Sequence, residues 1–355
     1  MPPPNSRRAR TGGFLAACLL ATAILAWAAP LEADDAIQAP TAETPLALLV
    51  TADGTAIWRE TGIESLDLPD GVGLTTLQAI DGGWVAAGNR WEDGETELFL
   101  LRSVAGETTP VAPPPGRLSL RGGPALVVGD GRLEGIVWLE GQRQENLVVL
   151  AARWDGGAWG DPEVVSPPGP GAQLALSAAV LDGGAWLVVW AAVDGEDDEI
   201  LWSFSPGESW SAPTRIHENN TVPDITPAVA PLAGGGAIVV WSALDDRHYR
   251  LRSSRFDGAR WELDAPFGAD GSTRPGFVFH GLERYLLYRS VVPDTWSLLE
   301  LDGDGIARRR ADALTPVGRR PVLDLRDPGA VFLHWPGLAS GPRAPAVPIP
   351  WQDLE

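Results

Sequence analysis

Short apolar runs that end in an aromatic residue recur along the chain at a nearly constant spacing. They read GIVW, LVVW, IVVW and YLLY and end at Trp138, Trp190, Trp241 and Tyr288, at steps of 52, 51 and 47 residues. β-Branched and aromatic residues in runs this short are typical of β-strands. The regular recurrence of one strand pattern therefore indicates a repeat architecture.

Two further sequence features recur with the same spacing. Turn sequences close on Trp159, Trp210 and Trp261, with steps of 51 residues. A proline opens several of the preceding apolar runs, at Pro124, Pro227, Pro275 and Pro321. Between these marks, apolar runs alternate with turns rich in Gly, Pro and Asp, so each period predicts four short antiparallel strands. Such a unit is the blade of a β-propeller.

Counting the blades predicts how the ring closes. Five full periods lie between residues 74 and 312, and a two-strand segment remains at each end, residues 46–60 and 321–335. Joined, the two segments complete a sixth blade and leave no long sheet edge unpaired. We therefore predict an all-β fold over residues 45–355. It is a six-bladed β-propeller of four-stranded antiparallel blades, closed by N-terminal strands that pair with C-terminal strands.

The tryptophans are expected to take two roles. The regularly spaced Trp138, Trp190 and Trp241 are predicted to pack between blades, since a buried indole contributes a large apolar area. The less regular ones are candidates for exposed platforms that stack on a sugar ring, and they are Trp91, Trp154, Trp202 and Trp296.

The first 28 residues have the pattern of a secretory signal peptide. Three arginines precede an uncharged run from Phe14 to Ala29, the usual order of a positive region, an apolar region and a cleavage site with small residues. We expect cleavage near Ala28; an uncleaved anchor is the alternative, although this run is short for a membrane span. Residues 29–44 are expected to be a flexible linker. The protein is thus predicted to be secreted or periplasmic.

Composition and charge limit the kinds of partner that the protein is expected to bind. All 27 basic residues are arginines and 47 residues are acidic, so the formal net charge is −20; this argues against nucleic acid and against an anionic membrane surface. The single cysteine, Cys18, lies in the predicted signal, which leaves the exported part without a disulfide. The four histidines show no zinc-binding spacing, so neither a metal site nor another cofactor is expected. We expect a monomer.

An acidic run, residues 194–199, allows two interpretations. Asp194, Glu196 and Asp198 alternate as calcium ligands do, but the glycine and the distal glutamate of a calcium-binding loop are missing. A solvated hairpin loop explains the run as well, and we favour that interpretation.

One stretch resembles a known repeat. Residues 197–216 read DDEILWSFSPGESWSAPTRI, which resembles the Asp-box of six-bladed sialidase-like propellers, a turn written Ser-x-Asp-x-Gly-x-x-Trp. Ser203, Gly207 and Trp210 match, whereas Ser205 stands at the Asp position. In that family the box is a structural turn, so the resemblance implies the fold and not an activity. Six-bladed fucose-binding lectins are also similar in repeat length, but their repeated Trp, Arg and Glu triplet is not found here.

Candidate ligand-binding residues lie on one face of the predicted ring. On this face, the loops that connect successive blades lie beside the loops that join the second and third strands of each blade. Arg274 and Arg320 begin predicted inner strands at the channel mouth, and with Arg121 they form a set that grips a carboxylate or phosphate. Sialidases use three arginines in a similar place, although their Arg-Ile-Pro motif is absent. Asp224 is the candidate acid, and His217 the candidate rim contact. Ion pairing of each arginine with a neighbouring acid is the alternative.

Two functions follow from these features. The sequence favours an exported propeller that acts as a noncatalytic binding or scaffold module for a carbohydrate or an exported protein partner. The alternative is a sialidase-like glycoside hydrolase of the exo-α-sialidase type that uses the arginine cluster. The resemblance implies that such an enzyme also needs a Tyr assisted by a Glu, for which Tyr285 or Tyr288 and Glu283 are the nearest candidates.

Overall fold

The computed structural model describes residues 35–39, 46–51, 54–59, 62–116, 118, 120–143, 146–169, 171–193, 197–207, 209–218, 220–245, 248–291, 294–314, 320–334 and 347–354. These residues form β-strands, with a 3-10 turn at Ala233–Gly235. Among them no helix has the length and apolar character needed to cross a membrane. The predicted signal peptide lies outside the described residues.

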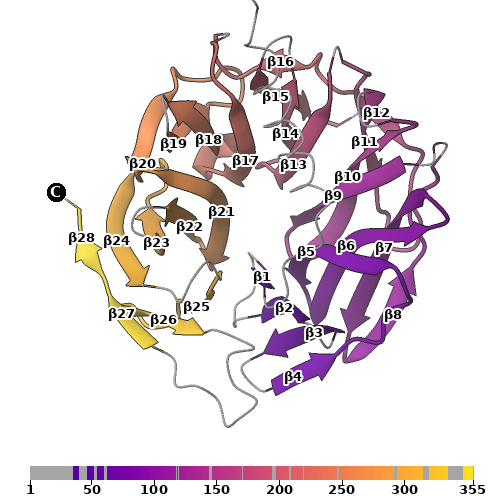
Figure 1. Ribbon diagram of the computed structural model, residues 1–355, viewed down its shortest axis with the longest axis horizontal. Coiled ribbons are helices and arrows are strands. Elements are labelled where there is room, and N and C mark those ends of the chain that lie inside the picture. Colours follow the sequence, from indigo (N-terminus) through magenta and orange to yellow (C-terminus); the bar gives the residue numbers. More distant parts are fainter. Residues whose placement is uncertain are drawn as a thin grey trace, which may run out of the picture.

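The strands form consecutive, mostly antiparallel groups arranged in a ring, as expected for a β-propeller (Figure 1). One parallel bridge, between Thr96 and Leu120, joins the second and third groups into one sheet. We call these groups blades 1 to 7 in chain order. Blade 1 contains β1 (Asp35–Gln38), β2 (Leu46–Thr51), β3 (Gly54–Arg59) and β4 (Gly62–Ser65). Blade 2 contains β5 (Val72–Ile80), β6 (Gly83–Glu92), β7 (Glu95–Val104) and β8 (Glu107–Val111). Blade 3 contains β9 (Leu120–Gly129), β10 (Arg132–Gly141), β11 (Val148–Arg153) and β12 (Glu163–Ser166).

The remaining blades follow the same order. Blade 4 contains β13 (Gln173–Val180), β14 (Trp186–Val193), β15 (Asp198–Ser205) and β16 (Thr214–Arg215). Blade 5 contains β17 (Asp224–Pro231), β18 (Ala237–Asp245), β19 (His248–Phe256) and β20 (Ala265–Asp270). Blade 6 contains β21 (Ser272–His280), β22 (Glu283–Val291), β23 (Asp294–Leu301) and β24 (Ala307–Leu314), with β28 (Gln352–Asp353) paired to β24. Blade 7 contains β25 (Val322–Asp324), β26 (Ala330–His334) and β27 (Val347–Pro350).

The structure differs from the six-bladed closure expected from the sequence. Asp35–Gln38, inside the predicted linker, form β1 and complete a four-stranded blade 1. Among the described strands, β25 to β27 pair only with one another. The two ends of the ring meet through side chains: Gln38 Nε2 donates to the carbonyl of Leu323 and Gln38 Oε1 accepts from its amide, both at 2.8 Å. Because the first blade has its own inner strand, it does not need strands from the C-terminus.

The regularly spaced tryptophans pack between blades, as predicted. Trp138, Trp190 and Trp241 are each 0% exposed. Trp241 of blade 5 packs in one cluster with Leu187 and Val189 of blade 4. The other two tryptophans are in clusters that likewise join their own blade to the preceding one. Each large side chain therefore fills the space between two twisted sheets.

Three of the four proline marks lie at a bulge near the start of an inner strand. The pairing register shifts there in four consecutive inner strands, and the bulged residues have positive φ: Gly123, Ala175, Thr226 and Arg274, at 58°, 50°, 53° and 53°. In three of the four, the next residue is one of the prolines. A bulge bends its strand and ends regular pairing locally, so Pro124, Pro227 and Pro275 each mark a bend. Pro321 instead directly precedes β25, as the sequence predicted.

The turn sequences that close on Trp159 and Trp261 both read Asp-Gly-x-x-Trp, and they lie between the third strand of a blade and the fourth. Asp155 Oδ1 accepts hydrogen bonds from the amides of Gly157 and Ala158, at 2.8 and 2.7 Å. Asp257 makes the same two bonds in blade 5. These backbone donors hold the pKa of both carboxyls below the usual range. In both turns the aspartate thus stabilises the local backbone.

Candidate functional site

Strand direction separates the polar residues onto two ends of the ring. First and third strands of a blade begin at the end where the chain passes between blades; we call this end the connector face. Second strands begin at the opposite end, which we call the turn face. Asp224 begins β17 and Asp198 begins β15, so both lie at the connector face. Glu283 begins β22 and therefore lies at the turn face.

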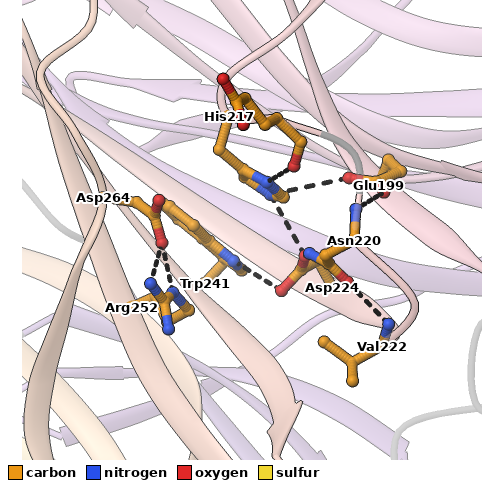
Figure 2. Close-up of polar contacts among 9 residues, drawn as sticks. Glu199, His217, Asn220, Val222, Asp224, Trp241, Arg252 and Asp264 are labelled. Carbon is orange, nitrogen blue, oxygen red and sulfur yellow. Dashed lines mark hydrogen bonds and ion pairs between the residues drawn. The ribbon is translucent and has the colours of Figure 1, made fainter.

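At the connector face, three ionisable side chains from three segments meet between blades 4 and 5 (Figure 2). His217 lies in the loop before β17, Glu199 is the second residue of β15, and Asp224 is the first residue of β17. His217 Nε2 lies 3.1 Å from Asp224 Oδ2 and 3.6 Å from Glu199 Oε2. Both carboxylates are 0% exposed. The sequence analysis selected His217 and Asp224 individually, and the structure brings them together.

Surrounding donors fix the two carboxylates. Asn220 Nδ2 donates to Asp224 Oδ2 at 2.8 Å, and the Asn220 amide donates to Glu199 Oε1 at 3.2 Å. Trp241 Nε1 donates to Asp224 Oδ1 at 2.8 Å. Asn220 is itself held by the amide of Val222, which donates to its side-chain oxygen at 2.6 Å. The carboxylate positions are therefore set by the β17 start and by the loop before it.

The histidine is held on two sides. Its ring stacks on Trp241, with ring centres 5.5 Å apart and planes inclined by 9°. Its Nδ1 lies 2.7 Å from the carbonyl oxygen of Glu218, and since a carbonyl only accepts, Nδ1 carries a proton. Burial lowers the pKa of His217, but the bonds to Asp224 and Glu218 and the charges of Asp224 and Glu199 outweigh it and raise this pKa to about 9.

More carboxylates lie beside this group. Asp197 and Asp198 are each 9% exposed. Burial, followed by the charges of Asp197 and Asp224, raises the pKa of Asp198 to about 6. Burial also raises the pKa of Tyr249, and the charge of Asp198 adds to that shift. Several carboxylates therefore surround one histidine in the interface between blades 4 and 5, where solvent exposure is low. The run that the sequence analysis interpreted as a solvated loop thus ends in buried carboxylates.

The buried Arg121 is neutralised within blade 3. Its Nε lies 3.2 Å from Glu140 Oε2, and its guanidinium donates to the carbonyl of Pro114 at 2.5 Å. The same carboxylate oxygen accepts from Trp138 Nε1 at 3.1 Å. Arg121 and Glu140 are 7% and 2% exposed. For this residue the ion-pair alternative holds, and its guanidinium is not directed at an open site.

The other two candidate arginines lie elsewhere. Arg274 is exposed at the blade 6 bulge, where its backbone amide donates to Ser242 Oγ at 3.2 Å. The Arg320 guanidinium lies over the ring of Trp296, 5.9 Å from its centre. Neither these two nor Arg121 lines the central cavity. The set of three arginines that the sequence suggested is therefore not found around this cavity.

The Tyr and Glu of the hydrolase alternative form a pair far from Asp224. Tyr285 donates to Glu283 Oε2 at 2.6 Å. Burial, together with the bond to Glu283 and its charge, raises the pKa of Tyr285, which opposes formation of a phenolate. The pair lies near the start of β22, at the turn face, whereas Asp224 lies at the connector face. A tyrosine, its carboxylate and the acid are thus not assembled into one site.

The tryptophans proposed as sugar platforms are mostly packed. Trp91 is 42% exposed and Trp296 is 5% exposed. Trp154 and Trp202 are half-buried against hydrophobic clusters of their blades. Only Trp91 of these four, all within the described residues, presents an open face.

The central channel encloses a cavity with a volume of about 920 Å³. Its wall consists of inner-strand residues, including Phe277 and Phe279. The charged and amide side chains that line it are those of Arg59, Gln78, Asp81 and Asp130. Asp81 and Asp130 precede second strands, so the cavity reaches the turn face. The candidate ligand-binding residues from the sequence lie at the opposite face, and these cavity residues were not among them, although their Asp-Gly turns are visible in the sequence.

Comparison with known proteins supports the fold. No family model matches the chain, and no curated protein matches it. A Dyadobacter fermentans protein of unknown function is 15% identical, with a TM-score of 0.52 over 78% of this chain and 94% of that one. A fucose-recognising lectin from Aleuria aurantia with a six-bladed β-propeller fold is 11% identical, with a TM-score of 0.50 over 81% and 99%. An α-L-arabinofuranosidase from Fusarium graminearum is 11% identical, with a TM-score of 0.50 over 78% and 92%. The chain is therefore similar in fold to β-propellers, and this likeness does not establish a function.

Proposed function

We propose that this propeller is a noncatalytic carbohydrate-binding protein that is exported, and that its ligand occupies the central cavity at the turn face. The observation that carries the proposal is the cavity itself. Its volume of about 920 Å³ falls within the range of roughly 300–1,000 Å³ that is usual for small-molecule sites. Its wall is formed mainly by inner strands from several blades and by the turns that follow them.

The lining suits a sugar. Phe279, half-buried in the wall beside the more deeply buried Phe277, supplies apolar surface for the C–H face of a pyranose ring. Arg59, Asp81 and Asp130 supply charged donors and acceptors for hydroxyl groups. With both signs of charge at the site and a net charge of −20 on the chain, a neutral sugar is favoured over an acidic one. The lectin of similar fold, which recognises fucose, makes neutral sugars the first ligands to try.

The hydrolase alternative has less support. Arg121 is already paired with Glu140, and Tyr285 is paired with Glu283 at the other end of the ring from Asp224. A sialidase-type mechanism needs all of these groups in one pocket. The second kind of ligand to consider is an exported protein, and the test below has an outcome that would indicate it.

The test is glycan binding by the purified protein, followed by titration of the best hit against two variants. Asp130→Asn removes a cavity carboxylate, and Asp93→Asn is its matched control. Both residues begin an Asp-Gly turn with positive φ, at 48° and 51°, but Asp93 joins β6 to β7 at the connector face. Loss of one hydrogen bond to a charged group is worth about 1.5–3 kcal/mol, so Asp130→Asn is expected to weaken binding about tenfold or more.

Each result bears on the proposal. Unchanged affinity for Asp93→Asn with a weaker Asp130→Asn supports the central cavity. Equal loss in both variants, or no loss in either, contradicts it. A blank array together with retention of an exported protein partner would replace the sugar by a protein. Release of reducing sugar from the bound glycan would contradict a noncatalytic role.

A further inference from the structure

The cluster at the connector face between blades 4 and 5 is not used by the proposed function. Its three ligand-type atoms, one from each of Glu199, His217 and Asp224, all lie within 4.8 Å of one another. His217 donates from Nδ1 to the carbonyl of Glu218, so Nε2 is the ring nitrogen that faces the carboxylates (Figure 2). One imidazole nitrogen and two carboxylate oxygens therefore converge on a common point.

The separations fit a small divalent ion. A tetrahedral zinc site with bonds of about 2.0–2.1 Å has neighbouring ligand atoms about 3.3 Å apart. The distances from His217 Nε2 to Asp224 Oδ2 and Glu199 Oε2 are 3.1 and 3.6 Å. Side chains at this spacing need little movement to bind an ion placed between them. Calcium is disfavoured because it prefers oxygen ligands only.

The surroundings are those of a metal site. In protein metal centres, a ligating histidine donates its other N–H to a carbonyl or carboxylate, and ligating carboxylates accept further hydrogen bonds. Here His217 meets the carbonyl of Glu218, and Asp224 accepts from Asn220 and Trp241. Glu199 accepts from the amide of Asn220. Each predicted ligand is thus oriented by a second group. Glu199 Oε2 accepts no hydrogen bond, and Asp224 Oδ2, which accepts one from Asn220, has a second lone pair for the ion.

A second observation points to a missing cation. Glu199 is fully buried, yet its Oε2 accepts no hydrogen bond, and His217 Nε2 lies 3.6 Å from it. Asp198, 9% exposed, has an Oδ1 that accepts no hydrogen bond either. A buried carboxylate oxygen without a partner is costly. A divalent cation bound beside these oxygens offsets that cost.

We propose that Glu199, His217 and Asp224 bind a divalent transition-metal ion of the zinc type, which joins blade 4 to blade 5. The ion takes the Nε2 lone pair of His217, and any proton on that nitrogen passes to solvent. Three protein ligands leave a fourth position for water. The site is independent of the sugar cavity, which lies at the other face. It departs from the expectation of no metal, which rested on the spacing of the histidines and on the lack of a calcium-loop pattern.

The experiment is zinc binding by the full chain after chelator treatment, with metal content measured by mass spectrometry and binding by calorimetry, in the absence of sugar. One zinc ion per chain is expected, with a rise in melting temperature. His217→Gln and Glu199→Gln are expected to weaken binding at least tenfold. His248→Gln is the matched control, because His248 is exposed at the start of β19, and it is expected to bind as the wild type does.

Three results would overturn the proposal: no zinc uptake by the wild type, equal uptake by His217→Gln, or equal loss in His248→Gln. If His217→Gln does not fold, nitrogen-15 spectra of the four imidazoles in the wild-type protein decide the matter. Zinc is then expected to shift the Nε2 of His217 and to leave the other rings unchanged. Shifts of a different imidazole would place the metal elsewhere. None of these readouts depends on sugar binding, so failure of either proposal leaves the other open to its own test.

Discussion

Replacing Glu140 by glutamine is predicted to destabilise the protein strongly. The change keeps the size of the side chain and an oxygen for Trp138 Nε1, which donates to Glu140 Oε2 at 3.1 Å. It removes the negative charge beside Arg121, which is 7% exposed. The guanidinium is then left buried beside a neutral amide.

The magnitude follows from the geometry. With Arg121 Nε 3.2 Å from Glu140 Oε2, two unit charges attract by about 5 kcal/mol at an effective dielectric constant of about 20. Removing one partner of a buried pair costs about 3–5 kcal/mol. The charge of Glu97 also acts on Arg121, so the lower end of this range, about 3 kcal/mol, is expected for the loss of unfolding free energy.

The assay is urea unfolding of the wild type and three variants: Glu140→Gln, Arg121→Met, and the double variant. The double variant contains no orphaned charge, so it is expected to be more stable than Glu140→Gln alone. Glu92→Gln is the control, because its pair with Arg90 is exposed and is worth less than about 1 kcal/mol. A loss below about 1 kcal/mol for Glu140→Gln, or strict additivity in the double variant, would refute this reasoning.

Three further predictions concern closure, strain and acid stability. Gln38→Ala removes both bonds to the Leu323 backbone and is expected to cost about 1–3 kcal/mol, with faster hydrogen exchange of the Leu323 amide; unchanged exchange would show that these bonds do not close the ring. Arg274→Gly relieves a φ of 53° and is expected to raise the unfolding free energy by about 1 kcal/mol without altering sugar binding; a lower melting temperature or weaker binding would contradict this. Asp257 has a pKa held below its unfolded value, so its stabilising effect is present at neutral pH and is lost as the pH falls from about 4 toward 2. Asp257→Asn should therefore lose less stability than the wild type over this range in thermal melts, and parallel curves would argue against it.

The repeat was predictable because the same packing problem recurs in each blade. Equivalent gaps between blades are filled by Trp138, Trp190 and Trp241. The length and position of each repeat could therefore be read from their spacing. The ends of the ring were not predictable by that route. β1 has only four residues, DAIQ, without an aromatic, and its pairing with β2 depends on tertiary contacts such as that of Gln38.

The candidate site was only half visible in the sequence. His217 and Asp224 were selected, but Glu199 was assigned to a solvated acidic loop because composition does not report burial. The three residues come from separate segments, so no spacing rule detects them as a group. Asp81 and Asp130 lie in turns that look like every other Asp-Gly turn in the chain. Which end of the channel is hollow depends on the tilt and bulges of the inner strands, and side-chain patterns do not encode this directly.

The central claim is that a sugar binds in the channel at the turn face. A crystal structure of the protein with its best-binding glycan tests this most directly. The account predicts electron density for the sugar inside the cavity, with hydroxyl groups within hydrogen-bond distance of Asp81 or Asp130 and a ring face against Phe277 or Phe279. Density for the sugar at the connector face, beside Arg274 or Arg320, with an empty channel would contradict it.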